Sequence, residues 1–215
     1  MTLNCDVYLV HYLPLADRLF FMDNQLKSLG IEYRLITDES PDDCFYDDAV
    51  IRRQKLSNFK NYNDKLLTRA DKSLIWKHHV CMKNASKSNR PSLILEDDAI
   101  LLDNFVATVN SFLDEKDWDI IFPGSGCNLR VMGRGLIKVP HPASKCTDSY
   151  VVTPDAAKKL STLDDSHLPI DWELAYKMME SNLSVYWYEP PIVRQGSQDG
   201  SLVSSINGKR ENLFI

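Results

Sequence analysis

The sequence predicts a layered α/β domain in which a mostly parallel central sheet is flanked by helices. A strand–helix–strand order opens the chain, and this order favours two parallel strands joined by a crossover helix. Short, fully apolar runs occur further on, of the kind that form buried central strands. The length of 215 residues suits one such domain over residues 1–215, and no repeat or linker divides it.

The spacing of apolar residues and one glycine predict the first strand, the first helix and the second strand. β-Branched and aromatic residues over 5–13 predict a strand. Apolar residues recur at helical spacing from Leu19 to Leu29, which predicts a helix that Gly30 ends. A second strand is expected over 31–37.

A polar region and a longer helix come next. Residues 38–64 are rich in Asp and Asn, so we expect a variable loop region there, with room for a short helix near 47–56. A longer helix is expected from Asp64 to about Lys87, with apolar residues on one face.

The rest of the chain alternates short strands with helices. Asp103 is a candidate cap for one helix, and Thr153 with Pro154 is a cap and first-turn pair for another. The stretch 124–146 holds four of the eight glycines and is expected to be an irregular loop or hairpin region. The remaining expected elements are strands over 93–95, 117–124 and 183–195, a helix over 103–116, a strand that passes into a helix over 147–160, and a helix over 169–182.

Composition narrows the class of protein. A net charge of −5 argues against a general nucleic-acid binder, and no segment reaches the roughly 20 apolar residues of a membrane-spanning helix. The start of the chain lacks the pattern of a secretory leader. The five cysteines are scattered and without CxxC spacing, which favours free thiols over a zinc site or a disulfide framework. A cytoplasmic protein is therefore expected.

An acidic triplet in "LILEDDAIL" (93–101) is the strongest candidate for a functional site. Glu96, Asp97 and Asp98 directly follow an apolar strand, and ligands of open α/β sheets bind beyond the carboxyl ends of such strands. Carboxylates there suit Mn²⁺ or Mg²⁺, with a diphosphate completing the coordination. Taken alone, the triplet is more often a strand cap or the start of a turn.

The chain resembles glycosyltransferase family 25, which includes lipooligosaccharide and collagen galactosyltransferases. The resemblance is carried by "LILEDDAIL", "DWDII" (117–121), "SYVVTPDAAKKL" (149–160), "LPIDWELAYKM" (168–178) and "YEPPIVRQGSQDGS" (188–201). Two departures stand out. His11-Tyr12-Leu13 replaces the family's usual Asn-Leu after the first strand, and "DKSLIWKHHV" keeps the His of the usual Ser-His pair as His78 but has Lys77 before it.

This resemblance implies an A-type glycosyltransferase fold, a nucleotide-sugar donor such as a UDP-hexose, and inverting transfer to a hydroxyl of a glycan or glycoconjugate acceptor. Asp98 is then the first choice for the metal ligand. Asp97 or Glu96 would contact the ribose, or the metal through water. Asp171 is the best candidate for the general base, with Glu173 second, although acids in a first helical turn also serve simply to complement the helix dipole.

Further donor contacts are expected from three other parts of the chain. Arg18 follows the first strand, and His78 precedes the acidic motif; a surface Arg and a satisfied core His are the ordinary alternatives. Gln195, Ser197 and Asp199 lie in a glycine-bearing segment that would close over the diphosphate, unless it is only an exposed loop.

Two other functional classes remain open from the sequence. A nucleotidyltransferase would also use an acidic metal site on an α/β sheet, but its usual glycine- and lysine-rich phosphate segment near the first strand is missing. A catalytically inactive carbohydrate-binding protein of the same fold is the other alternative, against which the intact acidic triplet and Asp171 argue.

Overall fold

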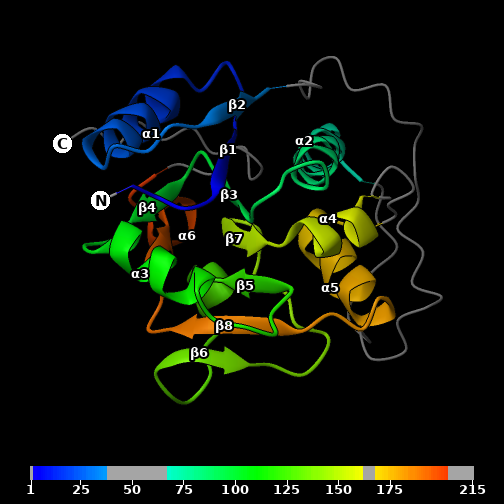
Figure 1. Cartoon of the computed structure of the whole chain (residues 1–215). Coiled ribbons are helices and arrows are strands. Elements are labelled where there is room, and N and C mark those ends of the chain that lie inside the picture. The colour runs from blue at the N-terminus through cyan, green and yellow to red at the C-terminus, as the bar shows by residue number, and fades with distance from the viewer. Residues whose placement is uncertain (1, 38–66, 162–167, 203–215) are drawn as a thin grey trace.

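The computed structural model describes residues 2–37, 67–161 and 168–202 (Figure 1). Along the chain the elements are β1 (Asp6–Val10), α1 (Ala16–Ser28), β2 (Arg34–Ile36), α2 (Arg69–Ala85), β3 (Ser92–Glu96), β4 (Ala99–Leu101), α3 (Phe105–Leu113), β5 (Ile120–Phe122), η2 (Gly126–Asn128), β6 (Gly135–Lys138), β7 (Ser149–Val152), α4 (Pro154–Leu160), α5 (Ile170–Glu180), β8 (Val185–Glu189), β9 (Val193–Gln195) and α6 (Gly196–Asp199).

A seven-stranded sheet in the order β2-β1-β3-β7-β5-β8-β6 forms the centre of the fold. Five strands run in one direction, because β1 is parallel to β2 and β3, and β5 is parallel to β8. The other two, β7 and β6, run the opposite way. The predicted class, α/β with a mostly parallel sheet, is confirmed.

Helices cover both faces of this sheet (Figure 1), and an apolar cluster lies on each face. Alternate residues of each strand point to opposite faces. Val7 and Leu9 of β1 therefore pack with α1 and α3, while Tyr8 and Val10 pack with α2, α4 and α5. The packing fixes the helices against the sheet, and with them the loops at its carboxyl edge.

A small second sheet lies at this edge. The chain turns sharply after β3, and β4 then pairs antiparallel with β9, with Ala99 opposite Gln195. The Gly196 amide donates to the Asp98 carbonyl at 2.8 Å. The segment after β9 is thereby held against the acidic motif, 98 residues apart from it along the chain.

Most of the expected elements are present, with shorter bounds. Thr153 caps α4 by accepting from the Ala156 amide, as predicted, and Gly30 follows α1 with a φ of +66°. The cap predicted at Asp103 is wrong: the residue before α3 is Asn104, in a left-handed conformation and without a side-chain capping bond. Residue 103 lies one position too early to act as the cap.

Short elements account for the other differences. The short strand β4 and helix α6 were not expected, and part of 124–146 forms β6, which pairs with β8. The expected loop region over 38–64, its short helix near 47–56 and the start of the helix at 64 lie outside the described residues, which resume at 67. Within the described residues, no helix is both long and apolar enough to span a bilayer.

Candidate active site

The acidic motif lies where β3 leaves the sheet. Glu96 is the last residue of β3, and Asp97 and Asp98 form the turn into β4. Both aspartates are buried, with 7% and 3% of their surface exposed. The three carboxylates therefore need partners within the protein or from a ligand.

Asp97 is held by the first strand and the helix that follows it. Its Oδ1 accepts from Arg18 at 2.6 Å, and its Oδ2 lies 2.8 Å from His11 Nδ1 and accepts from the Tyr12 amide at 3.3 Å. Burial would raise the pKa of Asp97, but the His11 hydrogen bond and the charge of Arg18 outweigh it and hold the pKa below its ordinary value. Asp97 thus ties β1 and α1 to the end of β3.

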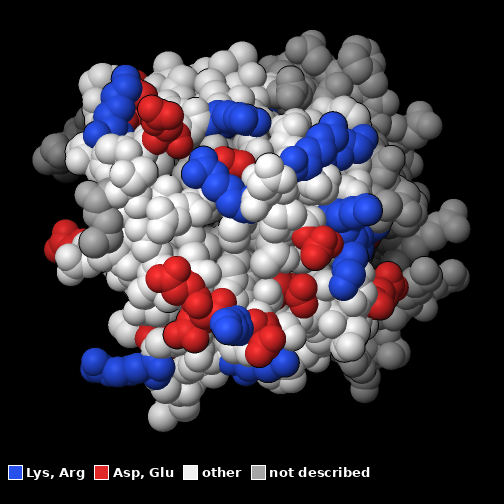
Figure 2. Space-filling model, in the orientation of Figure 1, with Lys and Arg blue, Asp and Glu red and all other residues white. Residues whose placement is uncertain are grey.

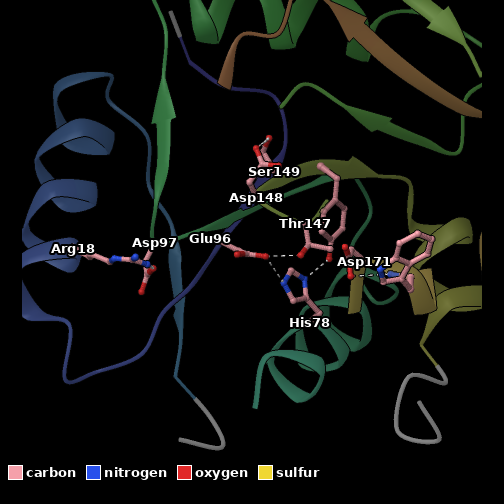
Figure 3. A network of polar contacts seen from close by, with 10 residues as sticks. Arg18, His78, Glu96, Asp97, Thr147, Asp148, Ser149 and Asp171 are labelled. Carbon is pink, nitrogen blue, oxygen red and sulfur yellow. Dashed lines mark hydrogen bonds and ion pairs between the residues drawn. The ribbon is translucent and has the colours of Figure 1, made fainter. Parts of the chain in front are cut away.

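Glu96 points the opposite way from Asp97, as consecutive residues at a strand end do (Figure 3). Its Oε1 accepts from Thr147 Oγ1 at 2.5 Å and lies 3.4 Å from His78 Nε2. The other ring nitrogen of His78 lies 2.8 Å from the Tyr150 hydroxyl. His78 is fully buried and does not line the cavity described below, so it would position Glu96 and not contact a ligand itself.

Asp98 is the least satisfied member of the motif. Its Oδ1 is buried and has no hydrogen-bond partner. Burial and the nearby Glu96 carboxylate raise the pKa of Asp98 to about 6, against the weaker opposing effect of the Ser197 hydroxyl. A cation beside this carboxylate would favour its ionised form and so offset both causes of the raised pKa.

Asp148 adds a fourth carboxylate that the sequence reasoning missed. It immediately precedes β7, is fully buried, and its Oδ1 has no partner. Burial, followed by the charges of Glu96 and Asp98, raises its pKa well above the ordinary value. Asp148 comes directly before the apolar run of β7. Because β7 pairs antiparallel with β3, the start of β7 lies at the same edge of the sheet as the end of β3, and the local sequence does not show this pairing.

A cavity of about 220 Å³ opens at this edge of the sheet. It is lined by the end of β1, the start of α2, the acidic motif and the segment after β9. Six of the residues expected to contact the donor or metal line it: Arg18, Glu96, Asp97, Asp98, Gln195 and Ser197. The Gln195 Oε1 is buried and, like Asp98 Oδ1, has no hydrogen-bond partner. Lys77, which was not expected, also lines the cavity.

Asp171 and Glu173 lie in the first turn of α5, outside the lining of this cavity. The Oδ1 of Asp171 accepts from the Trp172 amide at 3.0 Å. Burial, opposed by this bond and assisted by the charge of Glu96, raises the pKa of Asp171 to about 6. Glu173 accepts from the Leu168 amide at 3.2 Å, and the partly buried Trp172 packs against the core.

Asp199 lies in α6 and also does not line the cavity. It accepts from the Ser201 amide at 2.9 Å and lies 3.5 Å from Arg194. These contacts organise the turn after α6. Of the three residues expected to close over the diphosphate, Gln195 and Ser197 face the cavity and Asp199 contacts its own segment.

The donor set fits a hard divalent cation that a phosphate ligand helps to bind. Across the described ranges, no group of three or more His, Cys, Asp or Glu side chains is placed to hold a metal by itself. Mg²⁺ in nucleotide sites is held by one or two carboxylates together with substrate phosphates and water, and Mn²⁺ accepts the same oxygen ligands. Asp98 and Gln195 both line the cavity, and each has one buried side-chain oxygen without a hydrogen-bond partner, a carboxylate oxygen in Asp98 and a neutral amide oxygen in Gln195.

Comparison with known proteins identifies the fold and the family of this chain. The chain is similar to the crystal structure of a glycosyltransferase involved in the glycosylation of the major capsid of PBCV-1, at 10% identity and a TM-score of 0.51, over 92% of this chain and 100% of that one. The fold is that of A-type glycosyltransferases. The family model for glycosyltransferase family 25 (LPS biosynthesis protein) matches residues 7–128, more than half of the chain. The chain belongs to this family and is a glycosyltransferase.

Weaker similarities were found to two other solved structures, and no curated protein matches the sequence. One is a mutant Drosophila β1,4-galactosyltransferase 7 in complex with manganese, UDP-Gal and xylobiose, with 12% identity and a TM-score of 0.46 over 98% of this chain and 76% of that one. The other is the inositol-1-phosphate CTP transferase from T. maritima, with 10% identity and a TM-score of 0.43 over 94% and 73%.

Proposed function

We propose that this glycosyltransferase moves a hexose from a UDP-sugar to a hydroxyl of a glycan or glycoconjugate acceptor, with inversion at the anomeric carbon and with Mn²⁺ or Mg²⁺ at Asp98. The observation that carries the proposal is the cavity at the carboxyl ends of β1 and β3. It gathers the acidic motif, Arg18, Gln195 and Ser197 from segments that are far apart in the sequence. Family membership favours this reaction over the nucleotidyltransferase alternative.

The residues that line the cavity would bind the cation and the donor. Asp98, with its unpartnered oxygen, would hold the cation, and Gln195 and Ser197 would contact the donor beside it. The cation, when bound, would neutralise negative charge on the diphosphate. The Arg18–Asp97 pair would fix the wall that receives the nucleotide, and Glu96 would be oriented by His78 and Thr147.

Asp171 is the proposed general base. Inverting transfer needs one group that takes the proton of the acceptor hydroxyl as its oxygen attacks the anomeric carbon. A carboxylate whose pKa is about 6 is ionised at neutral pH and is a stronger base than an exposed aspartate. Its proximity to Glu96, which contributes to this pKa, supports a place near the donor.

A transfer assay and a binding assay test the proposal together. The purified chain is incubated with UDP-galactose, UDP-glucose and GDP-mannose, each with and without Mn²⁺, and nucleotide release is followed with a panel of glycan acceptors. Isothermal titration with UDP and GDP measures binding directly. We expect Mn²⁺-dependent UDP binding and release of UDP. Binding of GDP but not UDP, or transfer that is unchanged by chelation with EDTA, would overturn the donor or the metal assignment respectively.

A further inference from the structure

Helix α2 contributes one face of its first turns to the cavity. Ala70, Ser73, Leu74 and Lys77 line it, and their spacing of three and four residues places them on the same side of the helix. The start of α2 is fixed by a reciprocal capping box between Thr68 and Asp71. Lys77 is 97% buried on this fixed scaffold, since only 3% of its surface is exposed.

The ammonium of Lys77 lies near an aromatic ring of the cavity lining. Its Nζ is 5.7 Å from the centroid of the Tyr12 ring, and Tyr12 also lines the cavity. Cation–π contact of this kind attracts a lysine head group to the face of an aromatic ring and helps to hold it in place. The long side chain is therefore directed to the cavity wall, away from bulk solvent.

The charges of the cavity lining suggest how Lys77 would act on a bound diphosphate. Among the described residues of its lining, the cavity has the three carboxylates of the acidic motif and two cationic side chains, Arg18 and Lys77. Arg18 is committed to Asp97 at 2.6 Å. A diphosphate that enters this space meets a surplus of negative charge, which a divalent cation at Asp98 and a lysine ammonium would offset from two sides.

We propose that Lys77 binds the diphosphate of the donor and stabilises the negative charge that the departing nucleoside diphosphate acquires. This inference rests on the proposed function. In the transfer step, the bond between the anomeric carbon and the diphosphate oxygen breaks, and both electrons stay on that oxygen. The acceptor oxygen forms the new bond, and its proton goes to the base. Lys77 keeps its proton throughout and acts as a fixed positive charge.

A pair of lysines on the same helix gives a matched test. Lys72 is also buried, with 4% of its surface exposed, but it does not line the cavity. Lys77→Met and Lys72→Met each remove one buried ammonium from α2 and keep an unbranched side chain. Lys77→Arg retains the charge at the position. Isothermal titration in Mn²⁺ with uridine, UMP, UDP and inorganic diphosphate then measures which part of the ligand each lysine serves.

We expect Lys77→Met to weaken the binding of UDP and inorganic diphosphate by about 10- to 100-fold, the effect of losing a hydrogen bond between charged groups, while uridine binding stays unchanged. Lys72→Met should bind all four ligands as the wild type does, and Lys77→Arg should recover part of the loss. In single-turnover transfer, Lys77→Met should also lower the rate at saturating donor.

Three outcomes would overturn the inference: an equal loss for uridine and UDP, no loss for any ligand, or the same loss in Lys72→Met. Failure of the donor assignment gives a different pattern. If the wild type binds inorganic diphosphate in a Lys77-dependent manner but prefers another nucleotide to UDP, Lys77 keeps its role and the uridine donor is wrong. A wild type that binds no inorganic diphosphate at all would count against Lys77.

Discussion

Asp98 and its neighbours show how a strand can end in buried carboxylates. Asp97 is neutralised by Arg18 and His11, and Glu96 is engaged by Thr147 and His78, but Asp98 keeps an unpartnered oxygen. Asp98→Asn should abolish Mn²⁺-dependent UDP binding, as judged by calorimetry. The metal-free fold should be as stable or more stable, because the change removes repulsion among buried carboxylates, and the melting temperature tests this. Normal turnover in this variant would contradict the metal assignment.

Asp171 makes a separate prediction about rate. The Asn side chain can still accept from the Trp172 amide, which the Asp171 oxygen does at 3.0 Å, but it cannot take a proton. Asp171→Asn should therefore lower single-turnover transfer by roughly 10²- to 10⁴-fold with little change in donor binding. In the wild type, the rate should fall as the pH drops below about 6, the pKa of this carboxyl, because the base becomes protonated. Transfer at the wild-type rate would move the base to another residue, such as Glu173.

The same residue predicts a pH-dependent stability. Its pKa of about 6 in the folded chain exceeds the ordinary value of 3.8, so the folded state binds this proton more tightly than the unfolded state. The contribution is complete below about pH 4 and is lost as the pH rises through 6. Asp171→Asn should then raise the free energy of unfolding by about 1–3 kcal/mol at pH 8 and by less than about 1 kcal/mol at pH 4. Urea unfolding at the two pH values measures this difference, and a loss of stability at pH 8 would contradict it.

At the residue scale, the sequence could predict those site residues that stand in a recognisable local pattern. Six expected residues line one cavity, since each follows a strand or belongs to the acidic run. Asp148 and Lys77 were missed for a physical reason. The position of Asp148 depends on the antiparallel pairing of β7 with β3, and that of Lys77 on which side of α2 faces the cavity. Neither property is visible in the local sequence.

Helix α2 is the element that the proposed site depends on most. It carries His78 toward Glu96 and contributes Lys77 to the cavity lining, and its start is fixed by the capping box between Thr68 and Asp71. Thr68→Ala should lower the free energy of unfolding by about 1 kcal/mol, the usual effect of losing an N-cap side chain. Ser86→Ala at the other end of the helix is the control. Its hydroxyl donates to the Lys83 carbonyl near the protein surface, so the effect of its loss should stay within about 0.5 kcal/mol.

Elements were predictable where a hydrophobic period ran for several residues. Helices α1, α4 and α5 begin near their expected residues, and the β1–α1–β2 unit is parallel as expected. The short strand β4 and the helix α6 carry too few residues for a period to appear, and they form because they pair with distant chain segments. The cap at Asp103 was wrong since a left-handed Asn104 starts α3 instead.

At the scale of the whole molecule, the structure shows the charges of one face and the environments of four thiols. On the face in Figure 2, acidic and basic side chains are interspersed, with several Lys and Arg side chains over α2 and α4. Four described cysteines are free thiols: Cys5, Cys81, Cys127 and Cys146. Cys127 is exposed, with its sulfur 2.9 Å from that of Cys146, while Cys5 and Cys81 are buried.

These environments predict the order in which the thiols react. Burial raises the pKa of Cys5 to about 12, so this thiol is neither accessible nor ionised at neutral pH. Alkylation of the native chain, read by mass spectrometry, should modify Cys127 first and leave Cys5 and Cys81 unmodified until urea is added. A stable disulfide in the freshly isolated protein would contradict the prediction of a cytoplasmic protein with free thiols.

The pairing of β4 with β9 also determines when, during translation, all parts of the cavity have been synthesised. The acidic motif leaves the ribosome early, but Gln195, Ser197 and the Gly196 amide that holds the Asp98 carbonyl come about 100 residues later. At roughly 5–20 residues per second, this interval is about 5–20 s. During that time the growing polypeptide has its carboxylates but lacks one wall of the donor pocket. If the proposed site is correct, sugar transfer would begin only after this last part of the pocket has been translated.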